Sequence, residues 1–166
     1  MRIVGEQLQV WAEDKKVEHE KDIFARSAFN RFYYASFLIT RDMLGELKPE
    51  WKKTAHKNIP DLLRTSVKKA VDKELKKLFR KGVVSPGEMS ALKTSLNGAT
   101  SELSNLLTEA YDLRVIADYE PEVPVLTKNK VLLLRKYKLN SAREWPGKTG
   151  AFCKTIRKVW RDVGLA

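Results

Sequence analysis

Apolar residues recur at intervals of three and four along most of the first 120 residues of this 166-residue chain. That spacing places them along one face of an α-helix, where they can pack against another element. The sequence therefore predicts a mainly α fold. The expected helices cover about residues 2–15, 17–46, 54 or 60 to 80, and 86–118.

Helix-end signals separate these periodic stretches. Arg80-Lys81-Gly82 is a cationic last turn followed by a glycine, which is typical of a helix C-terminus. Ser85-Pro86-Gly87-Glu88 places proline and an acid in the first turn of the next helix. Pro121 and Pro124 then end that helix, because proline lacks the N–H that a helix interior needs.

The pattern changes after Pro124. Two apolar, β-branched runs flank a short polar break at Lys128-Asn129, which predicts a small β-hairpin without a turn glycine. Residues 150–163 return to helical spacing, with apolar and cationic residues on opposite faces. We therefore expect a helical domain over residues 1–121 and a basic C-terminal extension over residues 122–166, packed on the bundle or on a partner.

Positive charge is concentrated in this extension. Residues 128–166 hold eleven Lys or Arg against two acids, so they carry +9 of the formal net charge of +11. Such an excess favours a surface that contacts phosphates, although a solvated face is the simpler alternative. The candidate nucleic-acid-binding cations are Lys148, Lys154, Arg157, Lys158 and Arg161.

Cysteine and histidine are scarce. With Cys153 alone, no intramolecular disulfide can form, and with only His19 and His56 no tetrahedral zinc site of the usual kind can be assembled. We expect no metal and no cofactor. The N-terminus lacks an apolar core of signal-peptide length, and no run approaches a membrane span, so we expect a cytoplasmic protein without membrane association.

Arg31 lies among aromatic residues on the second predicted helix. An arginine in this setting suits phosphate and base recognition, because its planar group bonds bidentately and neighbouring rings can stack on bases. Tyr34 is a candidate for such stacking, although aromatic residues at helical spacing also form cores or dimer interfaces. The structural alternative for Arg31 is a salt bridge, for example to Asp118.

Three segments carry a family resemblance: NRFYYASF (30–37), AHKNIPDLL (55–63) and LRVIADYEP (113–121). Over roughly residues 5–121 the chain resembles the higher eukaryotes and prokaryotes nucleotide-binding (HEPN) domain. The resemblance implies an up-and-down antiparallel helical bundle that forms a homodimer and handles RNA or nucleotides, often in prokaryotic toxin-antitoxin or antiviral systems. The candidate catalytic residues that it implies are Arg31, His56, Arg114, Asp118 and Tyr119.

The matching segment departs from the catalytic pattern of HEPN ribonucleases, in which an arginine is followed four to six residues later by histidine. Here Arg114 is followed by Asp118 and Tyr119. Metal-independent RNA cleavage needs one group that accepts the 2′-hydroxyl proton and another that protonates the leaving oxygen, whereas an ordinary aspartate only accepts. His56, expected at the start of the third helix, is the candidate replacement for the missing imidazole.

Three functions remain open at this point. The first is a metal-independent endoribonuclease with a composite cleft at the dimer interface. The second is a non-catalytic RNA- or nucleotide-binding subunit that works beside a nucleotidyltransferase or another effector. The third is an interaction bundle whose basic helix binds an acidic antitoxin or partner.

One further pattern, AREWPGKT (142–149), fits a permissive phosphate-binding loop. A phosphate cradle needs consecutive backbone N–H donors, and Pro146 has none. Trp145 is too bulky for a tightly wrapped loop, and too few residues follow to complete a parallel sheet. We therefore expect no binding site for a nucleoside triphosphate in this segment.

Overall fold

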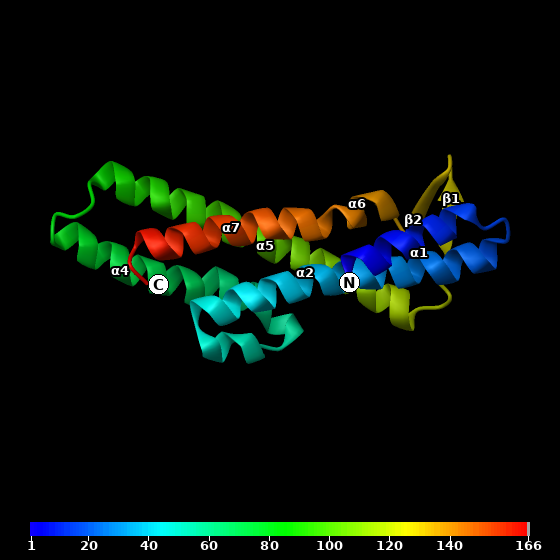
Figure 1. Ribbon diagram of the computed structural model, residues 1–166, viewed down its shortest axis with the longest axis horizontal. Helices are drawn as coiled ribbons and strands as arrows, with labels where there is room; N and C mark the ends of the chain where they lie inside the picture. Colours follow the sequence, from blue (N-terminus) through cyan, green and yellow to red (C-terminus); the bar gives the residue numbers. More distant parts are fainter. Residues whose placement is uncertain (166) are drawn as a thin grey trace. The chain divides into compact units, whose positions relative to one another are not determined.

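A computed structural model describes residues 1–165 and shows a mainly helical fold with a small three-stranded antiparallel sheet and a final helix (Figure 1). The predicted fold class is confirmed. The helices are α1 (Arg2–Asp14), α2 (Glu18–Leu47), α3 (Ile59–Leu62), α4 (Lys68–Arg80), α5 (Pro86–Tyr119), α6 (Leu139–Arg143) and α7 (Trp145–Asp162). The strands are β1 (Val125–Lys128), β2 (Val131–Leu134) and β3 (Tyr137–Lys138), and short helical turns are η1 (Pro49–Lys53), η2 (His56–Asn58) and η3 (Leu63–Val67).

The chain forms two compact units, each assembled from two separate segments. Unit 1 contains Met1–Leu38 and Leu107–Lys148, and unit 2 contains Ile39–Leu106 and the residues from Thr149 onward. The predicted extension, residues 122–166, thus contributes to both units. No helix in the described part of the chain is both long enough and apolar enough to cross a membrane.

In unit 1, α1 packs closely against α2. A three-residue connection joins the two helices, and a Cβ atom at Gly5 of α1 would lie 2.7 Å from the ring of Phe32 on α2. Phe32 is fully buried, so the ring has no space into which to retreat. At one end of this pair Trp11 meets Phe24 edge to face, and further along α2 Phe29 contacts Trp145. Glycine at position 5 is therefore what allows this close approach of α1 to α2.

The sheet of unit 1 is a meander of very short strands. Lys128 pairs with Val131, so the β1–β2 turn consists of Asn129 and Lys130, with φ angles of 50° and 63°. The hairpin was predicted, but its turn lies one residue later than the expected Lys128-Asn129. Two left-handed residues match the twist of a two-residue hairpin turn, and asparagine tolerates that conformation better than most side chains. Strand β3 was not predicted.

A single arginine closes the end of α5. The Arg26 guanidinium, on α2, donates to the backbone carbonyls of Ile116 and Ala117 at 3.2 and 3.1 Å, and also to three carbonyls just beyond the helix. Those three belong to Glu120, Pro121 and Val123. Asp22 pairs with the same arginine at 2.9 Å and accepts a hydrogen bond from the Val125 N–H at 2.7 Å. One ion pair thus supplies hydrogen-bond donors to carbonyls at the C-terminus of α5 and just beyond it, where intrahelical partners run out.

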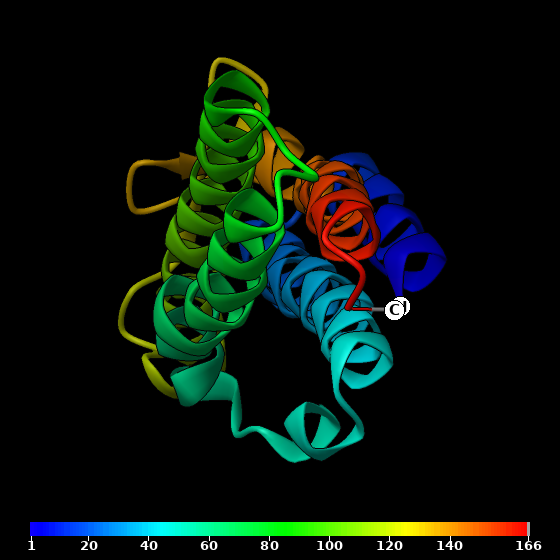
Figure 2. The same cartoon turned by 90° about the vertical axis from the view of Figure 1, so that its left-hand side faces the viewer.

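In unit 2, α4 and the first half of α5 run antiparallel (Figure 2). Three contacts fix their register: Asp72–Lys93, Lys68–Ser101 and Arg64–Asn105. The predicted ends are confirmed: Gly82 has φ of +68°, and the N–H groups of Gly82 and Val83 donate to the carbonyls of Phe79 and Leu78 in a Schellman motif. Ser85 and Glu88 exchange hydrogen bonds as a capping box at the start of α5.

The final helix, α7, begins at Trp145, five residues before the expected start. The loop-like AREWPGKT segment is therefore largely helical, and the Lys148 N–H donates to the Glu144 carbonyl within this helical segment. The Glu144 N–H likewise donates to a backbone carbonyl, that of Ser141. In unit 2, the buried stripe of α7 packs with η1, where Trp160 contacts Trp51 at a centroid distance of 5.7 Å.

A buried thiol in unit 2 yields a first prediction. Cys153 is fully buried, and burial raises the pKa of its thiol to about 12, although Arg157 and Thr40 act in the opposite direction. We expect the native protein to resist thiol reagents at pH 8 and to react once unfolded, because only the thiolate is nucleophilic. At pH 8 the folded thiol is protonated, whereas roughly a tenth of the unfolded chains carry the thiolate, and between pH 9 and about 12 the unfolded chain is mostly ionised while the folded thiol stays mostly protonated.

Stability should therefore fall as pH rises through that range, and the fall should be smaller in Cys153→Ala. Urea unfolding of both proteins at pH 8 and 10.5 measures this difference. Rapid labelling of the folded protein at pH 8 would show that the thiol is accessible.

Candidate functional site

Three of the predicted site residues, Tyr34, Asp118 and Tyr119, contact Arg114 in unit 1. Arg114 lies on α5, and its guanidinium carbon is 5.9 Å from the ring centroid of Tyr34 on α2 and 5.2 Å from that of Tyr119. Its Nε forms an ion pair with Asp118 at 2.8 Å, and its Nη2 lies 3.5 Å from the Tyr119 hydroxyl. We call Asn30, Tyr34, Arg114, Asp118 and Tyr119 the Arg114 cluster.

Asp118 has two partners in this cluster. Besides its ion pair with Arg114, its Oδ1 accepts a hydrogen bond from Asn30 Nδ2 at 2.6 Å. Burial of Arg114 alone would lower its pKa, but Asp118 and the two tyrosines outweigh it, so the pKa of Arg114 is raised. The guanidinium is therefore permanently charged, and the Asp118 carboxylate lies between this cation and the Asn30 amide that donates to it.

Further aromatic residues pack against Tyr34, a member of the cluster. Tyr33 is buried and contacts Tyr34, Phe37 and Tyr111 at centroid distances of 5.4, 6.4 and 5.9 Å. Burial raises the pKa of Tyr33 well above its ordinary value. Tyr33 is thus a core residue, whereas Tyr119 is 67% exposed and presents its ring to solvent.

Arg31 does not take the structural role suggested by the sequence. The expected partner, Asp118, is occupied by Asn30 and Arg114 instead. Arg31 is half-buried, and no hydrogen bond or ion pair joins it to another residue in the described part of the chain. His56 belongs to unit 2, where it is half-buried in η2 immediately before α3.

Three of the five candidate nucleic-acid-binding cations of the C-terminal segment are paired with carboxylates. Arg157 forms a two-pronged ion pair with Glu46 at 2.5 and 2.9 Å, and this contact lowers the pKa of Glu46. Lys148 pairs with Glu144 at 2.9 Å and Lys158 with Asp162 at 2.6 Å. Lys154 and Arg161 are exposed, and neither pairs with another described residue. Of the five candidates, only Lys154 and Arg161 therefore lack a carboxylate partner among the described residues.

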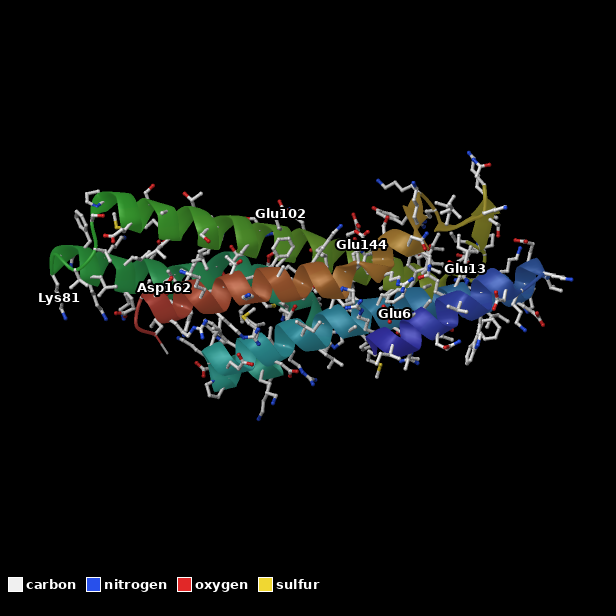
Figure 3. The ribbon with its side chains drawn as sticks, turned by 45° about the horizontal axis from the view of Figure 1, so that its top comes forward. Glu6, Glu13, Lys81, Glu102, Glu144 and Asp162 are labelled. Atoms are coloured by element: carbon white, nitrogen blue, oxygen red, sulfur yellow. The ribbon has the colours of Figure 1, made fainter. Side chains whose placement is uncertain are left out.

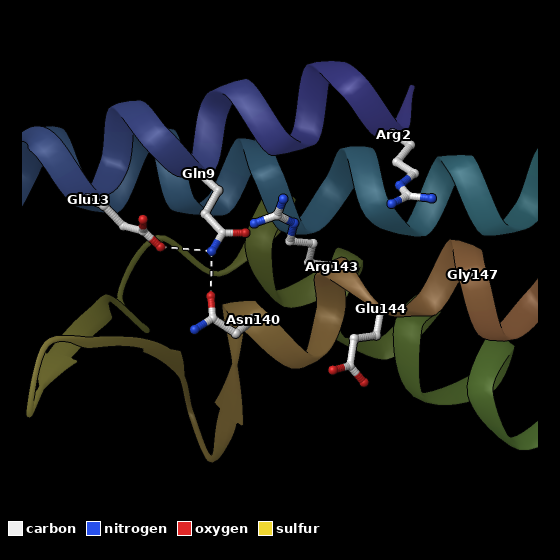
Figure 4. A pocket seen from close by; sticks show the side chains of 7 residues that line it. All are labelled: Arg2, Gln9, Glu13, Asn140, Arg143, Glu144 and Gly147. Carbon is white, nitrogen blue, oxygen red and sulfur yellow. Dashed lines mark hydrogen bonds between the residues drawn. The ribbon is translucent and has the colours of Figure 1, made fainter.

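A separate polar pocket of about 540 Å³ lies in unit 1 (Figure 4). The buried Gln9 on α1 donates to Glu13 at 2.8 Å and to Asn140 on α6, while its Oε1 is buried without a hydrogen-bond partner. Arg2, Arg143, Glu144 and Gly147 complete the lining. The pocket offers both guanidinium donors and carboxylate acceptors, and it shares no residue with the Arg114 cluster.

Sequence reasoning missed Asn30, Gln9 and Asn140. Asn30 is the first residue of the NRFYYASF segment, so the signal was present but was attributed to its arginine and tyrosines. Gln9 and Asn140 are 131 positions apart and carry no local motif. Their pairing follows only from the contact of α1 with α6.

The chemistry available to the Arg114 cluster is limited but specific. It presents a cation, an exposed ring, one carboxylate acceptor and one phenolic donor, with no imidazole among the cluster residues. No group of three or more histidine, cysteine or acidic residues in the described part of the chain could hold a metal ion. Binding of phosphate and stacking of a base are therefore better supported by these groups than acid–base catalysis.

The fold and site define a mainly helical protein with an arginine–tyrosine cluster on its surface. No protein-family model, curated protein or solved structure matches the chain.

Proposed function

We propose that this protein is a HEPN-like RNA-acting protein in which the Arg114 cluster binds RNA. The observation that carries the proposal is the position of the Arg114 guanidinium between the rings of Tyr34 and Tyr119, with the second ring largely exposed. Within the described residues its Nη1 has no hydrogen-bond partner, so an N–H edge remains for a phosphate oxygen. The Tyr119 ring can stack on a base irrespective of sequence.

The resemblance supports the wider setting of the proposal. On that basis the protein acts as a homodimer in the cytoplasm, in a toxin-antitoxin or antiviral system. Its partner would be a nucleotidyltransferase, another effector or an antitoxin. The binding role fits the cluster best, because Asp118 replaces the histidine of the catalytic pattern and is itself held by Asn30.

Substitution of Arg114 tests the proposal. We expect Arg114→Ala and Tyr119→Ala each to weaken binding of a labelled single-stranded RNA by roughly 5- to 100-fold, the range for loss of one stacked base or one charge-assisted contact. Tyr119→Phe keeps the ring and should bind nearly as wild type does. Fluorescence anisotropy measures the affinities.

Arg143→Ala is the matched control, because Arg143 is an arginine of the same unit whose side chain is 52% exposed. Its RNA affinity should be unchanged. Equal affinity of wild type, Arg114→Ala and Tyr119→Ala, with all three folded, would contradict the proposal. The Arg114–Asp118 ion pair joins neighbouring turns of one helix, so Arg114→Ala should remain folded, which circular dichroism checks.

A second candidate is metal-independent RNA cleavage. It is favoured by one observation: a proton acceptor, Asp118, and a hydroxyl donor, Tyr119, both contact the same guanidinium. Incubation with total RNA and tRNA in EDTA, followed by analysis of product ends, distinguishes the two. Cleavage that leaves 2′,3′-cyclic phosphates and is lost in Asp118→Asn or Tyr119→Phe would establish an enzyme, and the His56→Ala variant tests the sequence-based alternative.

A further inference from the structure

A row of unpaired cations lies along α4 in unit 2. Lys69, Lys73, Lys76 and Arg80 recur at intervals of four, three and four residues, which places them on one helix face. All four are exposed, and none forms a hydrogen bond or ion pair with another described residue. We call these four residues the α4 row.

The charge pattern of the sequence conceals this row. Residues 68–81 contain seven Lys or Arg and two acids, a net +5, whereas the first 127 residues together carry only +2. Acidic residues elsewhere thus mask the excess when charge is summed over long segments. The nearby acids are already engaged: Glu74 pairs with Lys77 at 2.7 Å, and Asp72 lies 3.7 Å from Lys93.

The opposite face of α4 identifies the side that is free to bind. Val67, Val71 and Leu75 are fully buried, and this buried stripe lies opposite the α4 row. The cations instead line a shallow depression of about 430 Å³ together with Asp72 and Lys77. Lys81, labelled in Figure 3, follows directly after Arg80, the last residue of α4, and is also exposed.

We propose that the α4 row is the track along which this protein holds the phosphate backbone of an RNA strand. The inference rests on the proposed RNA-binding function and adds a second contact surface to it. From Lys69 to Arg80 the row extends about 16 Å at the helical rise of about 1.5 Å per residue. A stacked strand places one phosphate about every 3.4 Å, so the row spans roughly five phosphates.

The chemistry of the α4 row favours RNA over other anionic partners. A helix that lies on a membrane inserts an apolar face, but the apolar face of α4 is buried within the protein. A protein partner needs an apolar contact centre, and the four residues of the row are all cations, although Phe79 beside Arg80 is 44% exposed. Four regularly spaced point charges instead suit a polymer with a regular charge repeat.

The test replaces all four cations of the α4 row with glutamine and compares this variant with a control variant that has glutamine at the exposed Lys16, Lys52, Lys53 and Lys57. Both lose four positive charges, so net charge is matched. Binding of a labelled unstructured RNA is measured by anisotropy between 50 and 300 mM KCl. For the α4 variant we expect affinity at 100 mM KCl to fall on the order of 100-fold, and the slope of log K against log salt to decrease by roughly 3.

The control variant should lose less than about 5-fold, because its four lysines lie outside the α4 row and do not share one helix face. A single-stranded DNA of equal length should show the same dependence on the α4 row, since the row contacts phosphates. Polyglutamate should bind weakly, and binding as tight as that of RNA would point to an acidic protein instead and overturn the inference.

The outcomes separate this inference from the proposed function. If wild type binds RNA and the α4 variant binds it equally well, the inference about the α4 row is wrong and the proposed function is unaffected. Equal losses in both quadruple variants would show a general charge effect and also overturn it. Absence of RNA binding by wild type at 50 mM KCl overturns the row and the proposed function together. Far-ultraviolet circular dichroism confirms that both variants are folded.

Discussion

Arg26→Ala is expected to destabilise the protein by about 3 kcal/mol, because it removes one half of a largely buried ion pair together with the donors that close α5. The Arg26 side chain is only 12% exposed. Without it, the carbonyls of Ile116 and Ala117 lose their side-chain donor, and Asp22 keeps a negative charge with only the Val125 N–H to compensate. Urea unfolding followed by circular dichroism measures the loss.

Two further variants test whether the loss depends on the several N–H donors of the Arg26 guanidinium. Arg26→Lys keeps the charge near the helix C-terminus, but one ammonium group cannot reach five carbonyls, so we expect an intermediate loss. Arg2→Ala removes an exposed arginine that also forms an i, i+4 ion pair, and it should cost less than about 0.5 kcal/mol. Similar stability of Arg26→Ala and Arg2→Ala would show that the contacts of Arg26 contribute little to the stability of the protein.

Gly5→Ala is expected to destabilise the protein by about 2 kcal/mol, although alanine is the better helix former. The new Cβ would lie 2.7 and 2.9 Å from two ring carbons of Phe32, closer than such atoms pack in proteins. Because Phe32 is fully buried, relief requires α1 to move away from α2. Thermal and urea unfolding measure the change.

Gly98→Ala provides the opposite case within the same protein. Gly98 lies inside α5, and a Cβ there would have no heavy atom within 4 Å apart from the helix's own backbone. We expect this variant to be more stable by about 0.5 to 1 kcal/mol, because alanine reduces the entropy of the unfolded chain without a clash. The same sign for both substitutions would contradict the contact between α1 and α2.

Much of the fold could be predicted because its signals are local. The helix ends at Gly82 and Ser85 depend on residues within one turn, and both were placed correctly. The shifted hairpin turn and the early start of α7 were harder. A turn without glycine is set by strand pairing, and the segment from Trp145 contains a proline and two glycines that argue against a helix unless Pro146 occupies the first turn.

The candidate site was predicted only in part, for the same reason. Arg114, Asp118 and Tyr119 lie within one turn and a half of α5, so their proximity follows from helical spacing. The contact of Asn30 with Asp118 spans 88 positions and depends on how α2 meets α5 in unit 1. Which cations are free depends on pairing between distant residues, and pairing such as that of Arg157 with Glu46, 111 positions apart, is invisible in the sequence.

The tryptophans provide natural optical reporters. Trp11 and Trp145 belong to unit 1, and Trp51 and Trp160 belong to unit 2. Each unit thus contains its own pair of indoles in a distinct aromatic environment. Replacing Trp51 and Trp160 with phenylalanine isolates the emission of unit 1. Replacing Trp11 and Trp145 isolates that of unit 2. The chain can therefore show by its own fluorescence whether two units built from interleaved segments melt as one body or in succession.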